Sequence, residues 1–102
     1  MKTWAFIYIF EGCNPKKDRA VIQSSKIKTF IVGTDSIDSG CEVAKELVKE
    51  GCRLIELCGG FGVDGTKKVI DAVGGSIPVG YVDFFPEEKE KVIRIFRNEE
   101  DL

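Results

Sequence analysis

The sequence of 102 residues contains no histidine. Histidine is the commonest general base near neutral pH and the commonest ligand of transition metals in proteins. Its absence leaves carboxylate, cysteine, lysine, tyrosine and backbone groups for any catalytic chemistry. We expect no metal site, and the residue pattern identifies no cofactor.

The chain also lacks paired cysteines, because no two of its four cysteines form a C-x-x-C pair. This spacing argues against a zinc ribbon and against a thioredoxin-type redox site. The first apolar run is too short for a membrane-spanning helix, and no signal-peptide cleavage site follows it. We therefore expect a cytoplasmic protein with reduced thiols that mostly fill the core, at Cys13, Cys41, Cys52 and Cys58.

The chain also has no excess of basic residues. It contains 15 lysines and arginines and 17 acidic residues, which gives a net charge of −2. Proteins that bind nucleic acid usually carry a basic surplus on one face, so we expect no nucleic-acid partner, and no membrane partner either. Apolar residues make up 43% of the chain and charged residues 31%. These proportions are typical of a soluble protein, and the length predicts a single α/β domain over residues 1–102.

Strand-like and helix-like patterns alternate along the chain. Strands are predicted at residues 4–10, 27–32, 53–58 and 77–82, and helices at residues 15–22, 37–50, 66–73 and from residue 86. This alternation indicates a parallel sheet with crossover connections. We expect an open parallel four-stranded sheet with helices on one or both faces, a flavodoxin-like β-α-β-α-β-α-β-α fold. In the last helix, Val92, Ile93 and Phe96 are expected to cover the sheet, and the helix is expected to fray beyond Asn98.

The most informative segment joins the third predicted strand to the helix after it, where four glycines fall within seven residues. Such a junction exposes backbone N–H groups at a helix N-terminus and favours an anionic ligand. We expect Phe61, in the middle of this loop, to be exposed as a lid or contact surface. The predicted ligand-binding residues are Gly59, Gly60, Phe61, Gly62, Gly65, Thr66 and Lys67.

Residues 60–65 also spell G-x-G-x-x-G, and Asp83 follows 23 positions after Gly60. This pattern formally matches the fingerprint of dinucleotide-binding folds. However, the following helix is short, and the chain has no room for two mononucleotide-binding halves. The segment is better explained as a simpler site for a phosphate or carboxylate group, with help from Thr66 and Lys67.

Two side chains of the third strand are candidates for catalysis. Glu56 stands among apolar residues, where burial would raise its pKa and suit a general acid or base. A structural hydrogen bond or a side chain that reaches the rim explains it equally well. Cys58 lies two positions later and leaves the strand on the same face, so it is either a thiolate nucleophile, with Tyr8 as an alternative, or a packed thiol.

Acidic residues follow several predicted strands, at Glu11, Asp35, Glu56 and Asp83. Because parallel strands end at one edge of the sheet, these carboxylates could converge on a hard cation such as magnesium. Helix capping and solvation are the simpler explanation of the same residues. The adjacent aromatic pair, Phe84 and Phe85, is either core or part of an apolar patch, and we expect it to support homo-oligomerisation.

Several segments resemble an uncharacterised family of small prokaryotic α/β proteins. They are N14-P15-x-x-x-R19-A20-V21-I22, V43-A44-K45-E46-L47-V48, I55-E56-L57-C58-G59-G60-F61-G62, V73-G74-G75 and I77-P78-V79-G80. The resemblance covers residues 5–82 and leaves out the charged last helix. It implies no established activity and supplies no catalytic residues, but it supports the glycine loop as the site.

Three functions remain open on these grounds. The first is a binding module that holds a small anionic metabolite at the loop of residues 59–66. The second is a small enzyme with Glu56 as its acid or base and backbone amides that stabilise negative charge. The third is a structural protein that forms a homo-oligomer and binds no ligand.

Overall fold

Five strands form a single sheet with the order β2-β3-β1-β4-β5. In this computed structural model, which describes residues 1–97, the strands are β1 (Lys2–Ile9), β2 (Arg19–Gln23), β3 (Ile27–Thr34), β4 (Ile55–Leu57) and β5 (Val79–Tyr81). The pairs β1–β3, β1–β4 and β4–β5 are parallel, whereas β2–β3 is antiparallel. The α/β class is confirmed. The four-stranded, flavodoxin-like arrangement is wrong because a fifth strand lies antiparallel at the edge.

The predicted helix over residues 15–22 does not form. Only one turn follows Asn14, whose carbonyl accepts hydrogen bonds from the amides of Lys17 and Asp18 at 3.0 and 2.7 Å. The Asp18 carboxylate closes this turn by accepting a hydrogen bond from the Asn14 amide. The chain then enters β2, where β-branched residues pair with β3. Pairing with a strand later in the chain therefore replaces the helix predicted over residues 15–22.

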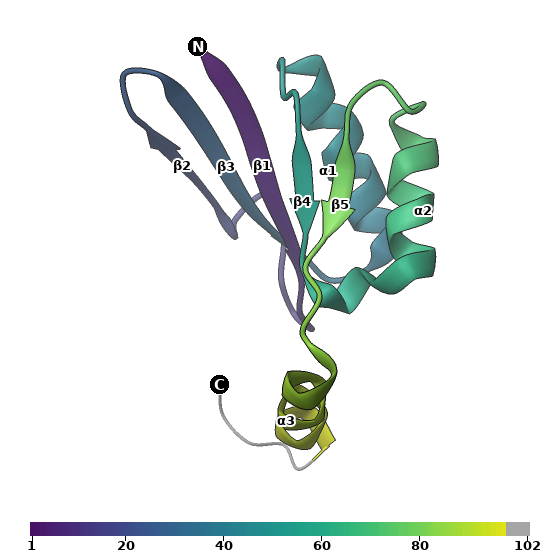
Figure 1. Ribbon diagram of the computed structural model, residues 1–102. Coiled ribbons are helices and arrows are strands. Elements are labelled where there is room, and N and C mark those ends of the chain that lie inside the picture. The colour runs from purple at the N-terminus through teal and green to yellow at the C-terminus, as the bar shows by residue number, and fades with distance from the viewer. Residues whose placement is uncertain (98–102) are drawn as a thin grey trace.

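The helices are α1 (Ile37–Lys49), α2 (Gly62–Ala72) and α3 (Pro86–Arg97), and a 3₁₀ turn, η1 (Gly59–Phe61), precedes α2. The Ser36 side chain caps α1 by accepting a hydrogen bond from the Ser39 amide. α2 begins at Gly62, four residues before the predicted start. Figure 1 shows α1 and α2 together on one face of the sheet. Within residues 1–97, no helix is both long and apolar enough to cross a membrane.

The core lies between the sheet and these two helices. Ala5 and Ile7 of β1 are fully buried there, as are Ile55 and Leu57 of β4. The residues between them on each strand point to the opposite face, because side chains alternate along a strand. The chain thus builds its core on one side of the sheet only.

We call the opposite side of the sheet the open face. The last helix was expected to cover the sheet with its apolar side chains, and this expectation is wrong. α3 lies beyond the carboxyl ends of the strands (Figure 1), and none of its residues is buried. The expected fraying beyond Asn98 lies outside the described residues.

Candidate functional site

A cleft of about 330 Å³ lies at the carboxyl ends of the strands, where the glycine loop meets the segment that leads into α3. Open parallel sheets bind ligands at this end. We call it the glycine cleft. Its lining comes from the loop and the start of α2, from the end of β5 and the segment after it, and from one side of α3. The lining residues are Gly59, Gly62, Val63, Tyr81, Val82, Asp83, Phe84, Lys89, Val92 and Ile93.

The backbone amides of the loop fall into two groups. The Phe61 amide donates to the Cys58 carbonyl at 3.1 Å, and the Gly62 amide donates to the Gly59 carbonyl. The amides of Gly59 and Gly60 donate to no partner within residues 1–97. Both of these glycines are exposed, but only Gly59 lines the cleft; Gly60, which was predicted to bind the ligand, does not.

The glycine loop bends because of Gly62, whose φ of +62° lies in the left-handed region. A side chain there would be strained even though a Cβ would meet no atom within 4 Å. This position therefore requires glycine for the backbone turn between η1 and α2, and the turn leaves Gly59 on the cleft wall.

Phe61 is buried, with only 3% of its surface exposed, so the expectation that it is an exposed lid or contact surface is wrong. Its ring packs against α1, where a Cβ on Gly40 would lie 2.7 Å from the ring. A Cβ on Gly65 would lie 3.3 Å from the Cβ of Phe61. Gly65 is thus explained by close packing of α2, and Phe61 anchors the loop to the core.

Thr66 and Lys67 do not line the glycine cleft. The Thr66 hydroxyl donates a 2.6 Å hydrogen bond to the Gly62 carbonyl, and the residue is 5% exposed. The cation at the cleft is instead Lys89 of α3. Sequence reasoning missed Lys89 because nothing local ties a lysine of the last helix to a loop that ends more than twenty residues earlier.

Lys89 is paired with a carboxylate at the cleft wall. Its Nζ lies 3.3 Å from the Asp83 carboxylate, and both side chains are about half exposed. The pKa of Asp83 lies below its usual value because the Phe84 amide donates a hydrogen bond to it and because Lys89 is nearby. Asp83 is therefore ionised at neutral pH, and it competes with any anionic ligand for Lys89.

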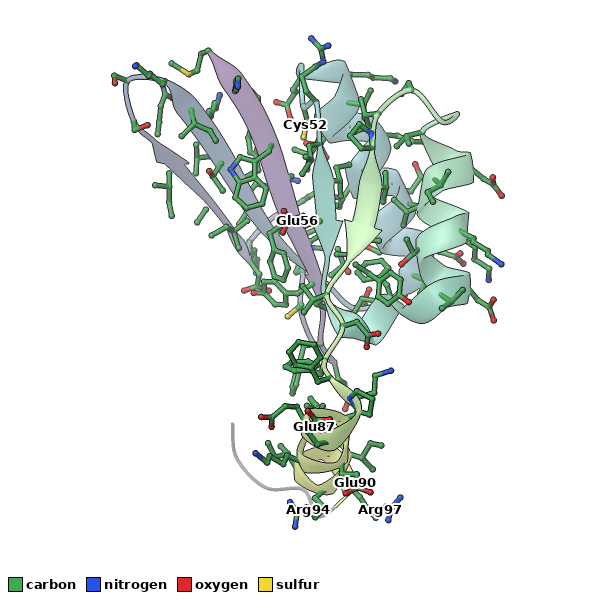
Figure 2. The ribbon with its side chains drawn as sticks, viewed as in Figure 1. Cys52, Glu56, Glu87, Glu90, Arg94 and Arg97 are labelled. Atoms are coloured by element: carbon green, nitrogen blue, oxygen red, sulfur yellow. The ribbon has the colours of Figure 1, made fainter. Side chains whose placement is uncertain are left out.

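Glu56 lies on the open face, away from the glycine cleft. Its neighbours in β4, Ile55 and Leu57, are buried, whereas Glu56 itself is exposed. Figure 2 shows it beside β4, well separated from the labelled charged residues of α3. Glu56 lines a different hollow of about 560 Å³, which also includes Trp4 and Leu54. The carboxylate that the sequence places among apolar residues is solvated because only one face of β4 is covered.

Cys58 stays close to the loop, where its sulfur accepts a hydrogen bond from the Ile9 amide at 3.3 Å. A Cβ on Gly60 would lie 3.4 Å from this sulfur. Glu56 and Cys58 therefore border different parts of the surface and share no cleft. Tyr8 is not activated, because desolvation, with Cys13 and Asp18 nearby, raises the pKa of its phenol.

The family of the chain follows from a comparison over almost its whole length. Residues 2–97 match a family of unknown function (DUF6506). The chain belongs to this family. The match confirms the resemblance to an uncharacterised family and extends it across α3, which the resemblance left out. Comparisons with curated proteins and with solved structures give no match.

The remaining polar groups of this DUF6506 chain do not form a metal centre: within residues 1–97, no three histidine, cysteine, aspartate or glutamate side chains gather in one place. The carboxylates that follow the strands thus do not converge. All four thiols are free. Burial raises the pKa of Cys52, and desolvation raises the pKa of Cys41, so both stay protonated at neutral pH and act as packing groups.

Proposed function

We propose that this protein binds a small molecule with a phosphate or carboxylate group in the glycine cleft. One observation carries the proposal: the loop that the sequence singles out lines a cleft that also contains a lysine. The free amide of Gly59, which lines the cleft, supplies a hydrogen-bond donor, and Lys89 supplies a positive charge. Both kinds of group favour an anion.

The other residues that line the cleft indicate the chemistry of the rest of the ligand. Val63, Tyr81, Val92 and Ile93 present apolar surface to the cleft. A cleft of about 330 Å³ is at the lower end of the size range of small-molecule sites. The ligand that fits is therefore a small acid with a short apolar part, and not a dinucleotide.

The test is an NMR titration of the ¹⁵N-labelled protein with inorganic phosphate and, separately, with butyrate. We expect the amide resonance of Gly59, which lines the cleft, to shift in a saturable way with either probe. Butyrate is expected to shift Val63 and Ile93 as well, because its chain would reach the apolar wall. Shifts spread over the surface without saturation would show that the loop is not a site.

Two lysine variants separate a specific contact from general charge. Lys89→Met is expected to weaken binding about tenfold, which corresponds to the loss of one charge-assisted contact of about 1.4 kcal/mol. Lys49→Met, in the last turn of α1 and outside the cleft lining, makes the same charge change and is expected to leave binding unaltered. Equal effects of the two variants would contradict the proposed role of Lys89.

Asp83 gives a test of opposite sign. Asp83→Asn removes a negative charge from the cleft wall and frees Lys89 from its partner. We therefore expect this variant to bind phosphate more tightly than the wild type, by a few-fold at low ionic strength and by less at high salt. Weaker phosphate binding by Asp83→Asn would contradict the placement of the anion beside Lys89.

A further inference from the structure

The open face carries a row of aromatic side chains along the middle strand of the sheet. Trp4, Phe6 and Tyr8 alternate along β1 on the side away from the buried Ala5 and Ile7. All three aromatic residues are half-buried. The Tyr8 ring lies flat over its cross-strand partner, since a Cβ on Gly33 would come within 2.6 Å of it.

This row continues as an apolar surface on the neighbouring strands. Ile22 of β2 is 61% exposed, and Ile27 and Leu54 are also exposed at the edges of the face. Ile22 pairs with Thr29, which pairs in turn with Trp4, so these side chains lie on the same side of the sheet as the aromatic row. A surface of this kind on a soluble protein marks an interaction site.

Parallel sheets are almost always covered on both faces. Here α1 and α2 cover one face, and within residues 1–97 no helix covers the other, which only the turn with Cys13 and Asp18 approaches, beside Tyr8. α3 cannot take this role alone, because a helix of 12 residues is roughly 18 Å long and about 10 Å wide, or on the order of 180 Å². Strands at ~4.8 Å spacing with lengths up to ~26 Å give the open face on the order of 500 Å².

We propose that two copies of this chain form a dimer through their open faces. The two sheets then stack, with the aromatic rows of both copies at the centre. Two such faces together bury on the order of 1,000 Å², which is the lower limit for a specific interface. A face with its largest side chains on the middle strand can pack against the same face of a copy about a two-fold axis. The contact fits the roughly 10 Å spacing of stacked sheets.

Charge also favours a second copy over an unrelated partner. The hollow on the open face contains one carboxylate, Glu56, and two cations, Lys2 and Arg53. Opposite charges on one face can pair with the same face of a copy, whereas a face of one sign would repel it. The net charge of −2 adds little repulsion between two chains.

Trp4 is the only tryptophan of the chain and lies on the open face, so the wild-type protein reports the contact without any substitution. We expect light scattering at high concentration to give twice the 11.3 kDa mass of the chain. On dilution, Trp4 emission is expected to shift to longer wavelength and acrylamide quenching to increase, with the same midpoint as the change in mass.

Two adjacent residues of β2 provide matched variants. Ile22 lies on the open face, whereas Val21 pairs with Phe30 and points to the opposite side, and it is 49% exposed. Ile22→Glu is expected to raise the dissociation constant of the dimer at least tenfold, because the charge enters the interface twice. Val21→Glu is expected to leave it unchanged. Circular dichroism of both variants confirms that the fold is retained.

A variant of α3 tests whether the dimer forms through α3 and not through the open face. Phe96 is 58% exposed on α3 and lies outside the open face. If Phe96→Glu abolishes the dimer and Ile22→Glu does not, the contact is made by α3 and the proposal is wrong. A wild-type chain that remains monomeric at high concentration would also overturn it, whether Trp4 is exposed or is shielded by another segment of the same chain.

Discussion

The two faces of the sheet come from the same strands and differ in almost every other respect. On the face under α1 and α2, Ala5, Ile7 and Ile55 have no exposed surface. On the open face, Phe6 is half-buried and Glu56 is exposed, although both alternate with those residues along the same strands. One face is therefore closed by this chain, and the other remains available to a partner.

The difference shows that an apolar residue in a strand is not necessarily buried within its own chain. Residues 4–10 form a continuous apolar run, which is typical of a strand covered on both sides. Half of that run supports the fold of the single chain, and the other half has no covering element of its own within residues 1–97. Stability should depend strongly on the covered face and weakly on the open face.

The largest effect should come from a pair of isoleucines, one on each face. Ile7→Ala removes a fully buried side chain and is expected to lower the free energy of unfolding by about 3 kcal/mol. Ile22→Ala, at a residue that is 61% exposed, is expected to cost about 0.5 kcal/mol or less. Urea denaturation at a concentration where the chain is monomeric measures both values. Similar losses from the two variants would mean that the open face is already closed in the monomer.

A pair of glycines should give an intermediate effect. Gly40→Ala places a methyl group 2.7 Å from the Phe61 ring and is expected to destabilise the protein by about 1–3 kcal/mol through overpacking. Gly80→Ala, in β5 on the open side, meets no atom within 4 Å and is expected to be neutral or slightly stabilising. Thermal unfolding of both variants checks this ordering. A harmless Gly40→Ala would show that Phe61 is not held against α1.

The sequence predicted those helices, strands and turns whose formation depends on residues close together in the chain. The helix predicted over residues 37–50 forms as α1, and the predicted junction from strand to glycine loop to helix forms as β4, η1 and α2. Each of these features rests on residues within a few positions of one another. The glycine loop was therefore found from sequence, and it lies on a cleft at the end of the sheet where parallel folds bind ligands.

The errors concern contacts between distant parts of the chain. The segment at Asn14 carries a helix start signal, and only pairing of β2 with β3 makes it a strand. The burial of Phe61 depends on Gly40, which lies 21 positions earlier in another helix. The lysine of the cleft, Lys89, comes from α3. The periodicity of a short segment cannot predict these contacts, because each one depends on tertiary packing.

The smallest expected effect concerns an ion pair on the covered side. Arg19 of β2 binds Glu46 of α1 with two hydrogen bonds, at 2.9 and 3.3 Å, and so ties the edge strand to the helix layer. The hydrogen bond from Arg19 holds the pKa of Glu46 below its usual value of 4.5. Because the Glu46 side chain is half exposed, Arg19→Met is expected to cost only about 0.5 to 1 kcal/mol at pH 7.

The pH dependence of that cost follows from the sign of the shift. A carboxyl whose pKa is lowered in the folded state contributes stability above its unfolded pKa, and this contribution disappears as the pH falls through its folded pKa. The difference in unfolding free energy between wild type and Arg19→Met should therefore be constant from pH 7 to 5 and should decrease at lower pH, as Glu46 becomes protonated in the folded state. Glu42→Gln, which breaks a pair within α1 that is more exposed, is the matched control and should cost less. A cost for Arg19→Met that persists after Glu46 is protonated in the folded state would assign its effect to lost packing of the arginine stem across β2 and not to the ion pair.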